Sequence, residues 1–191
     1  MRKLGVLKTF AEERNLLFRE IPAQDEAVDN YIYSRDMRYR YAFARYWKSE
    51  GDIVLWVGIN PATGDTEKRR RPTLDRCVRW SIEWGAAGLI YANLFAARHT
   101  DPKALHEVSD PVGPHNDAAL ALVSQIADHT VVAWGNSGKP EMRAMEVIQL
   151  KLLHNPSCLG VTSKGQPRHP LYVRGGTTLV SWPGGPSEHG A

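Results

Sequence analysis

Cysteine is scarce in this chain, and its scarcity excludes several kinds of site. The 191 residues contain two cysteines, Cys77 and Cys158, and no Cys-x-x-Cys spacing. A four-thiolate zinc or iron–sulfur site is therefore excluded, and both positions are typical of buried free thiols. We expect no metal ion and no other cofactor.

Long apolar runs and a strong excess of one charge are also lacking. No hydrophobic stretch approaches the length that crosses a bilayer, and the N-terminal pattern is amphipathic and interrupted by acids, unlike a signal peptide. The chain has 42% hydrophobic and 24% charged residues and a net charge of +3, values typical of a soluble globular domain. We expect a cytoplasmic monomer that has no membrane partner.

Short β-forming runs alternate with helix-like segments along most of the chain. Strand patterns cover 39–47, 53–59, 86–95, 129–135 and 157–162. Helix patterns cover 74–85, 116–128 and 139–153, and Asn116 is the expected helix cap. This alternation predicts an α/β fold, a three-layer sandwich around a mostly parallel sheet of roughly four to five strands.

The expected domain organisation follows from the same patterns. Residues 1–36 are interpreted as an added helix and loop, 37–181 as the α/β domain, and 182–191 as a flexible tail rich in proline and glycine.

Polar residues follow each predicted parallel strand, where open α/β sheets bind their ligands. Asn60-Pro61 follows the first strand, Asn93 the second, Gly135-Asn136 the third, and 168–172 (RHPLY) lies beyond the fourth. Each residue alone is equally typical of a turn or of a buried strand end. Four such ends at one edge of a sheet predict one site.

The segments at these strand ends resemble the motifs of the uracil-DNA glycosylase superfamily, particularly its mismatch-specific uracil and thymine glycosylase branch. They are VGINPA at 57–62, YANLF at 91–95, VVAWGN at 131–136 and RHPLYV at 168–173. The sequence is also similar to a group of short bacterial proteins that share this pattern. In two places it departs from the superfamily: Ala62 stands where uracil-only branches carry an aromatic residue, and Leu171-Tyr172 replaces the usual serine after His-Pro.

The resemblance implies a role for each candidate residue. Asn60 would position the hydrolytic water, and His169 would stabilise charge on the departing base. Asp65 is an alternative base if its loop folds back, although it could equally cap that loop. The expected substrate-binding residues are Ile59, Pro61, Ala62, Asn93 and Asn136. The expected DNA-binding residues are Lys68, Arg69, Arg70, Arg71, Lys164, Arg168, Leu171, Tyr172 and Arg174.

These residues lead to a functional hypothesis. Ala62 would leave room beside C5 of a pyrimidine, so we expect a DNA glycosylase that flips and excises a modified pyrimidine from duplex DNA. Hydroxymethylated or glucosylated cytosine of bacteriophage DNA is an example, and the role would be antiviral defence. No lysine occupies a motif position, so we expect abasic sites without strand cleavage. The alternatives are a uracil or mismatch repair glycosylase, a catalytically silent module that binds modified DNA, and a hydrolase of free nucleosides or nucleotides.

Overall fold

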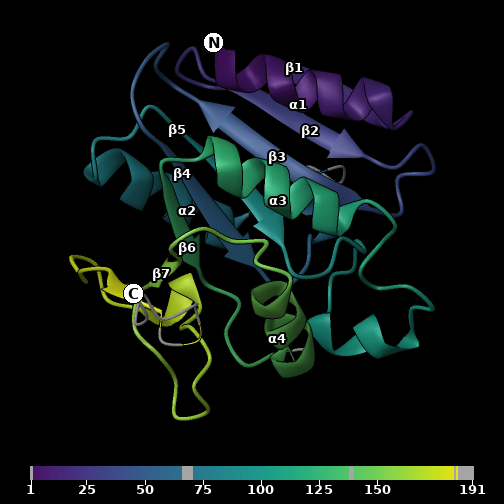
Figure 1. Cartoon of the computed structure of the whole chain (residues 1–191). Helices are drawn as coiled ribbons and strands as arrows, with labels where there is room; N and C mark the ends of the chain where they lie inside the picture. Colours follow the sequence, from purple (N-terminus) through teal and green to yellow (C-terminus); the bar gives the residue numbers. More distant parts are fainter. Residues whose placement is uncertain (1, 66–70, 138–139, 183, 185–191) are drawn as a thin grey trace, which may run out of the picture.

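The structure is a computed structural model that describes residues 2–65, 71–137, 140–182 and 184 (Figure 1). Its strands are β1 (Leu17–Pro22), β2 (Val28–Tyr33), β3 (Arg40–Tyr46), β4 (Ile53–Gly58), β5 (Gly88–Asn93), β6 (His129–Val132), β7 (Ser157–Cys158) and β8 (Val180–Ser181). Its α-helices are α1 (Arg2–Glu13), α2 (Pro72–Glu83), α3 (Asn116–Ile126) and α4 (Glu141–Gln149). The 3-10 turns are η1 (Thr63–Asp65), η2 (Pro102–Glu107) and η3 (Pro170–Tyr172).

All the strands join one mixed sheet, in the order β1-β2-β3-β5-β4-β6-β7-β8. Strands β5, β4, β6 and β7 are parallel neighbours, whereas β1, β2, β3 and β8 are paired antiparallel. The α/β class is confirmed. The predicted sheet of roughly four to five mostly parallel strands is wrong, because the described residues form eight strands of mixed direction.

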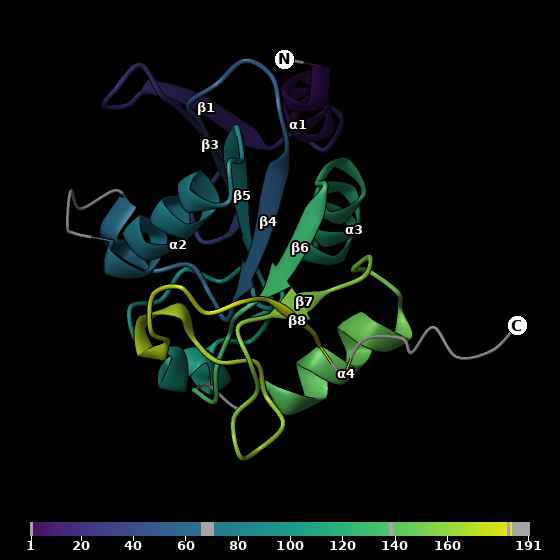
Figure 2. The same cartoon turned by 90° about the vertical axis from the view of Figure 1, so that its left-hand side faces the viewer.

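Helices cover both faces of the sheet (Figure 2). The larger hydrophobic core joins one face of the sheet to α1, α3 and α4, through residues such as Phe10, Leu120 and Val147. The second core joins the other face to α2 through Leu74 and Trp80. Strands β4 and β5 are buried along their whole length, as expected for parallel strands covered on both faces.

The N-terminal segment contains more structure than the predicted helix and loop. After α1, residues 17–22 and 28–33 form the antiparallel strands β1 and β2. Their pattern is poorly alternating because β1 is an exposed edge strand and β2 is almost entirely buried. At the other end, buried Trp182 packs edge-on against Trp134, with ring centroids 4.9 Å apart.

Asn116 does not cap α3, contrary to the prediction. His115 is the cap position, and Asn116 is a buried residue of the first turn. Its side-chain amide donates to the backbone carbonyls of Asn93 and Leu94, at 3.1 and 2.8 Å. These hydrogen bonds therefore connect α3 to the carboxyl end of β5.

The search for membrane-spanning helices, restricted to the described residues, found none long and apolar enough to cross a bilayer.

Candidate functional site

Two neighbouring cavities lie at the carboxyl ends of the parallel strands. The first, of about 250 Å³, is lined by Asn60 and Ala62, by His99, and by Arg40, Arg71 and Tyr91; we call it the Asn60 cavity. The second, of about 770 Å³, is lined by Asn136, Thr162, Arg168, Leu171 and Tyr172; we call it the Tyr172 cavity. The two share Ile59, Thr100, Pro102 and His169. His169 therefore stands where the cavities meet.

The end of β4 holds the Asn60 amide in one orientation. Asn60 Nδ2 donates to the backbone carbonyl of His99 at 2.8 Å and, more weakly, to that of Pro61 at 3.4 Å. The Pro61 carbonyl also accepts from the backbone N–H of His99 at 3.0 Å. Because its amide hydrogens face these carbonyls, Asn60 Oδ1 is left as the acceptor, and it has no partner within the described residues. A half-buried acceptor of this kind can hold and orient a water molecule.

His169 is held as a neutral donor. Its Nδ1 accepts a long hydrogen bond of 3.4 Å from the backbone N–H of Leu171, so the neutral ring carries its proton on Nε2. Burial lowers the pKa of His169, which favours the uncharged imidazole near neutral pH. Gly135 packs beneath it at a φ of +70°, where an added Cβ would lie 3.0 Å from His169 Cβ. Only glycine combines this backbone conformation with so close an approach.

The other expected substrate-binding residues are placed less uniformly. Ile59 lines both cavities, and exposed Ala62 lines the Asn60 cavity. Asn136 lines only the Tyr172 cavity, where its Oδ1 accepts from Thr162 Oγ1 at 2.9 Å. Pro61 is buried and does not line either cavity. Asp65 ends η1 close to the Asn60 cavity, but its side chain lies outside the described part of the chain.

Asn93 is fully buried and does not line either cavity. Its side chain is 1% exposed, and neither its Nδ2 nor its Oδ1 has a hydrogen-bond partner among the described residues. An added Cβ on Gly58 would lie 3.0 Å from Asn93 Oδ1 and 2.5 Å from the Tyr91 hydroxyl oxygen. Tyr91 does line the Asn60 cavity, so the unpaired amide lies close behind the cavity wall.

The expected DNA-binding residues fall into three groups. Arg168, Leu171 and Tyr172 line the Tyr172 cavity, and the Tyr172 side chain is 84% exposed. Lys164 and Arg174 are exposed and line neither cavity. Lys68, Arg69 and Arg70 lie outside the described residues. Arg71, by contrast, lines the Asn60 cavity beside the start of α2.

Several residues that line the Asn60 cavity were not predicted from the sequence. They are Arg40, Phe43, Tyr91, His99 and Thr100. His99 reads as one of several scattered surface histidines, yet its carbonyl orients Asn60 and its Nδ1 lies 2.9 Å from the carbonyl of Asp101. Its position after a buried strand at the ligand-binding edge was the available signal. No group of three or more His, Cys, Asp or Glu side chains that could hold a metal ion occurs among the residues described.

A family model described as "Protein of unknown function (DUF1643)" matches residues 40–171. The match covers more than two thirds of the chain and includes all the described residues that line the Asn60 cavity. The searches of curated proteins and of solved structures found no match.

Proposed function

The chain belongs to the family DUF1643, and we propose that it is a DNA glycosylase that hydrolyses the bond between a modified pyrimidine and its deoxyribose. The observation that carries this proposal is that Asn60 and His169 line one cavity with complementary polar atoms. Asn60 offers an acceptor for water, and His169 offers an Nε2–H donor. The resemblance of the strand-end motifs to the uracil-DNA glycosylase superfamily agrees with this pairing.

In the proposed reaction the water oxygen forms a bond with C1′ while the bond between C1′ and the base nitrogen breaks. The bonding electrons leave with the base, and the water proton passes to solvent. Asn60 Oδ1 accepts a hydrogen bond from the attacking water and fixes its position, since an amide has no pKa suited to a general base. His169 donates to the oxygen of the departing base, where negative charge develops.

The surroundings of the pair support a substrate with a substituent at C5. Ala62 lines the cavity and is exposed, so the wall there consists of a methyl group rather than an aromatic ring. DNA would lie over the Tyr172 cavity, where Arg168 can meet phosphate and exposed Leu171 and Tyr172 can enter the base stack. Excision of bases found in bacteriophage DNA would serve antiviral defence.

A direct assay tests this proposal. The protein is incubated with bacteriophage DNA containing hydroxymethylated or glucosylated cytosine and, separately, with uracil-containing DNA. Released bases are identified by mass spectrometry, and abasic sites are counted. We expect release from the modified DNA, reduced about 100-fold or more by Asn60→Ala or His169→Ala. His154→Ala is the matched control, because the exposed His154 lines neither cavity.

The possible results separate the alternatives. Abasic sites in uracil-containing DNA alone would replace the modified-base proposal with a repair glycosylase. Salt-dependent DNA binding without any base release would favour the silent binding module. Full activity of both Asn60→Ala and His169→Ala would show that the site is assigned wrongly.

A further inference from the structure

One end of the Asn60 cavity is rich in cationic and donor groups. It is formed by β3, β5 and the start of α2, and its lining includes Arg40, Phe43, Arg71 and Tyr91. None of the described residues that line the cavity is an aspartate or glutamate. The nearby carboxylate of Asp29 is bound in a bidentate pair by Arg45, at 2.6 and 2.7 Å.

A β-bulge directs Arg40 into this cavity. Ile32 pairs with Ala42, but the next residue of β2, Tyr33, pairs with Arg40, so Tyr41 is the extra residue of β3. Without the bulge, strict alternation would place Arg40 on the face of Ala42, away from Phe43. With it, Arg40 joins Phe43 in lining the cavity, although its side chain is only 9% exposed. Bulges commonly re-aim a side chain beside a functional site.

Arg71 and the first turn of α2 lie at the same end. Arg71 is the cap position, its own side chain makes no capping hydrogen bond, and Pro72, Thr73 and Leu74 line the cavity. The backbone N–H groups of a helix's first turn and the helix dipole favour an anion. Arg71 is held in place by the Tyr31 hydroxyl at 2.9 Å and by Asp29 at 3.7 Å. It also lies over the Phe43 ring, 5.3 Å from its centroid.

Tyr91 provides an independent indication of a ligand. The side chain is 8% exposed and lines the cavity, and its hydroxyl makes no hydrogen bond with any residue that the structure describes. A hydroxyl that lines a cavity without a protein partner can donate to a ligand there. Burial raises the pKa of Tyr91 and the nearby charge of Arg40 opposes the rise, so the hydroxyl is protonated and able to donate.

We propose that this end of the cavity, formed by Arg40, Arg71, Tyr91 and the first turn of α2, is an oxyanion subsite that binds a phosphate or carboxylate group of the pyrimidine ligand. The proposal rests on the proposed function, since it takes the base to lie against Asn60 and His169. The oxyanion has two possible sources. It is either the phosphate of a free mononucleotide or an acidic substituent on a base flipped out of DNA.

Binding to the full chain, measured by titration calorimetry, distinguishes the two sources. In one arm the probes are dUMP and dCMP, each against its nucleoside. In the other arm they are duplexes that carry a single 5-carboxycytosine or 5-hydroxymethylcytosine. We expect the acidic member of at least one arm to bind about tenfold or more tightly, the size expected for charge-assisted hydrogen bonds. The arm that shows the preference identifies the source.

Variants show whether the preference arises in this subsite. Arg71→Gln should abolish it, Tyr91→Phe should weaken it, and Arg71→Lys should retain part of it. Arg45→Gln is the matched control, because Arg45 binds the same Asp29 without lining the cavity. Thermal unfolding confirms that each variant is folded.

The proposal is overturned if acidic and neutral probes bind alike in both arms, or if Arg45→Gln and Arg71→Gln lose the preference equally. Base release from DNA is measured in parallel. An Arg71-dependent preference without base release would retain the subsite and refute the glycosylase. Base release without any preference for acidic probes would retain the glycosylase and refute the subsite.

Discussion

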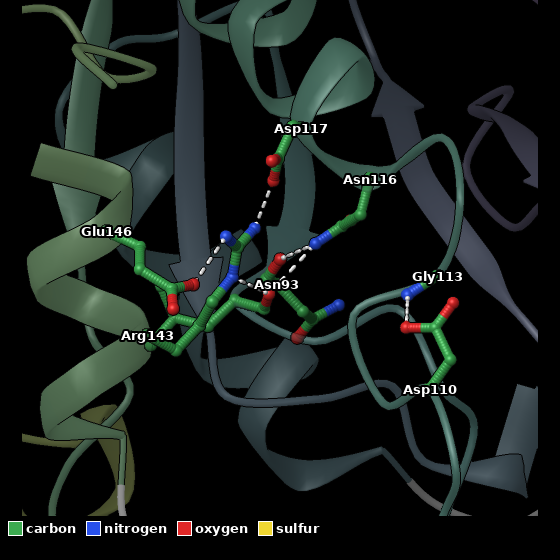
Figure 3. A network of polar contacts seen from close by, with 8 residues as sticks. Asn93, Asp110, Gly113, Asn116, Asp117, Arg143 and Glu146 are labelled. Carbon is green, nitrogen blue, oxygen red and sulfur yellow. Dashed lines mark hydrogen bonds and ion pairs between the residues drawn. The ribbon is translucent and has the colours of Figure 1, made fainter. Parts of the chain in front are cut away.

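The two sides of the sheet at the carboxyl end of β5 are built differently, and Figure 3 shows the polar network on the side of α3 and α4. On the side of α3 and α4, donors converge on the strand backbone. Arg143 donates to the Leu94 carbonyl at 3.0 Å, contacts Glu146 at 3.3 Å and binds Asp117, while Asn116 donates to the carbonyls of Asn93 and Leu94. On the side of α2, the amide of Asn93 and the hydroxyl of Tyr91 have no partners among the described residues.

This difference suggests that the α3 and α4 side supports the fold, whereas the α2 side forms the candidate site. Buried donors that make hydrogen bonds stabilise the fold, and their loss leaves the accepting carbonyls without partners. Buried polar groups that are not used destabilise the fold, so their presence beside a cavity indicates a role in binding. Changes on the α3 and α4 side should therefore reduce stability, whereas changes on the cavity side should reduce function with little effect on stability.

The largest effect on function without a matching loss of stability should come from Gly135→Ala. The new Cβ would lie 3.0 Å from His169 Cβ, in a backbone conformation that alanine rarely adopts. A displacement of about 1 Å at a reacting group can cost about 100-fold in rate, which we expect for base release. Gly165→Ala is the control, because Gly165 has a similar φ of +74° and nothing within 4 Å. An equal loss of activity in both variants would contradict the assigned contact.

Arg143→Ala should have the largest effect on stability. It removes charge-assisted hydrogen bonds that join α4 to the end of β5 and to α3. Because Asp117 and Glu146 are partly exposed, we expect a loss of about 2–3 kcal/mol in the free energy of unfolding rather than the larger cost of an isolated buried charge. Denaturant titration measures it. Glu146→Gln, which affects only the more exposed contact, should cost less than about 1 kcal/mol.

Asn93→Leu should separate the two sides most clearly. It replaces an unpaired buried amide with an apolar group of similar size, so the free energy of unfolding should be unchanged or rise by about 1 kcal/mol. Base release or ligand binding should fall, because Asn93 lies next to Tyr91, directly behind the wall of the Asn60 cavity. Asn116→Leu should lower the free energy of unfolding instead, because its Nδ2 donates to two backbone carbonyls, even though its Oδ1 has no partner among the described residues. Equal losses of stability in Asn93→Leu and Asn116→Leu would contradict the proposed difference between the two sides of the sheet.

The sequence predicted the middle of the sheet better than its edges. Strands β3, β4, β5 and β6 were expected because fully buried or alternating patterns mark them. Strands β1 and β2 were missed, since an exposed edge strand and a strand buried on both faces each lack alternation.

Within the site, the strand-end rule predicted where Asn60 and His169 would lie, since parallel strands end at one edge. Arg40 could not be predicted, because its direction depends on a bulge that no local pattern encodes. Asn116 was misread for a related reason. Its residue type favours a cap, but its side-chain amide is buried and donates to the carbonyls of Asn93 and Leu94.

The smallest effect should be the pH dependence of His169, the group where the cavities meet. Its pKa in the folded protein is lowered by burial, so the stabilisation from the neutral ring is present above the ordinary value and is lost as pH falls through the lowered one. Protonation would also place a hydrogen on Nδ1 against the Leu171 N–H, which now donates to it. Unfolding free energy should thus decline on acidification more in the wild type than in His169→Gln. Base release should change little from pH 8 to 7 and fall only in more acidic solution.

His106→Gln serves as the control, because the exposed His106 lines neither cavity. If His169→Gln leaves the acid dependence of stability unchanged, the ring is not the buried neutral donor that the proposed chemistry needs.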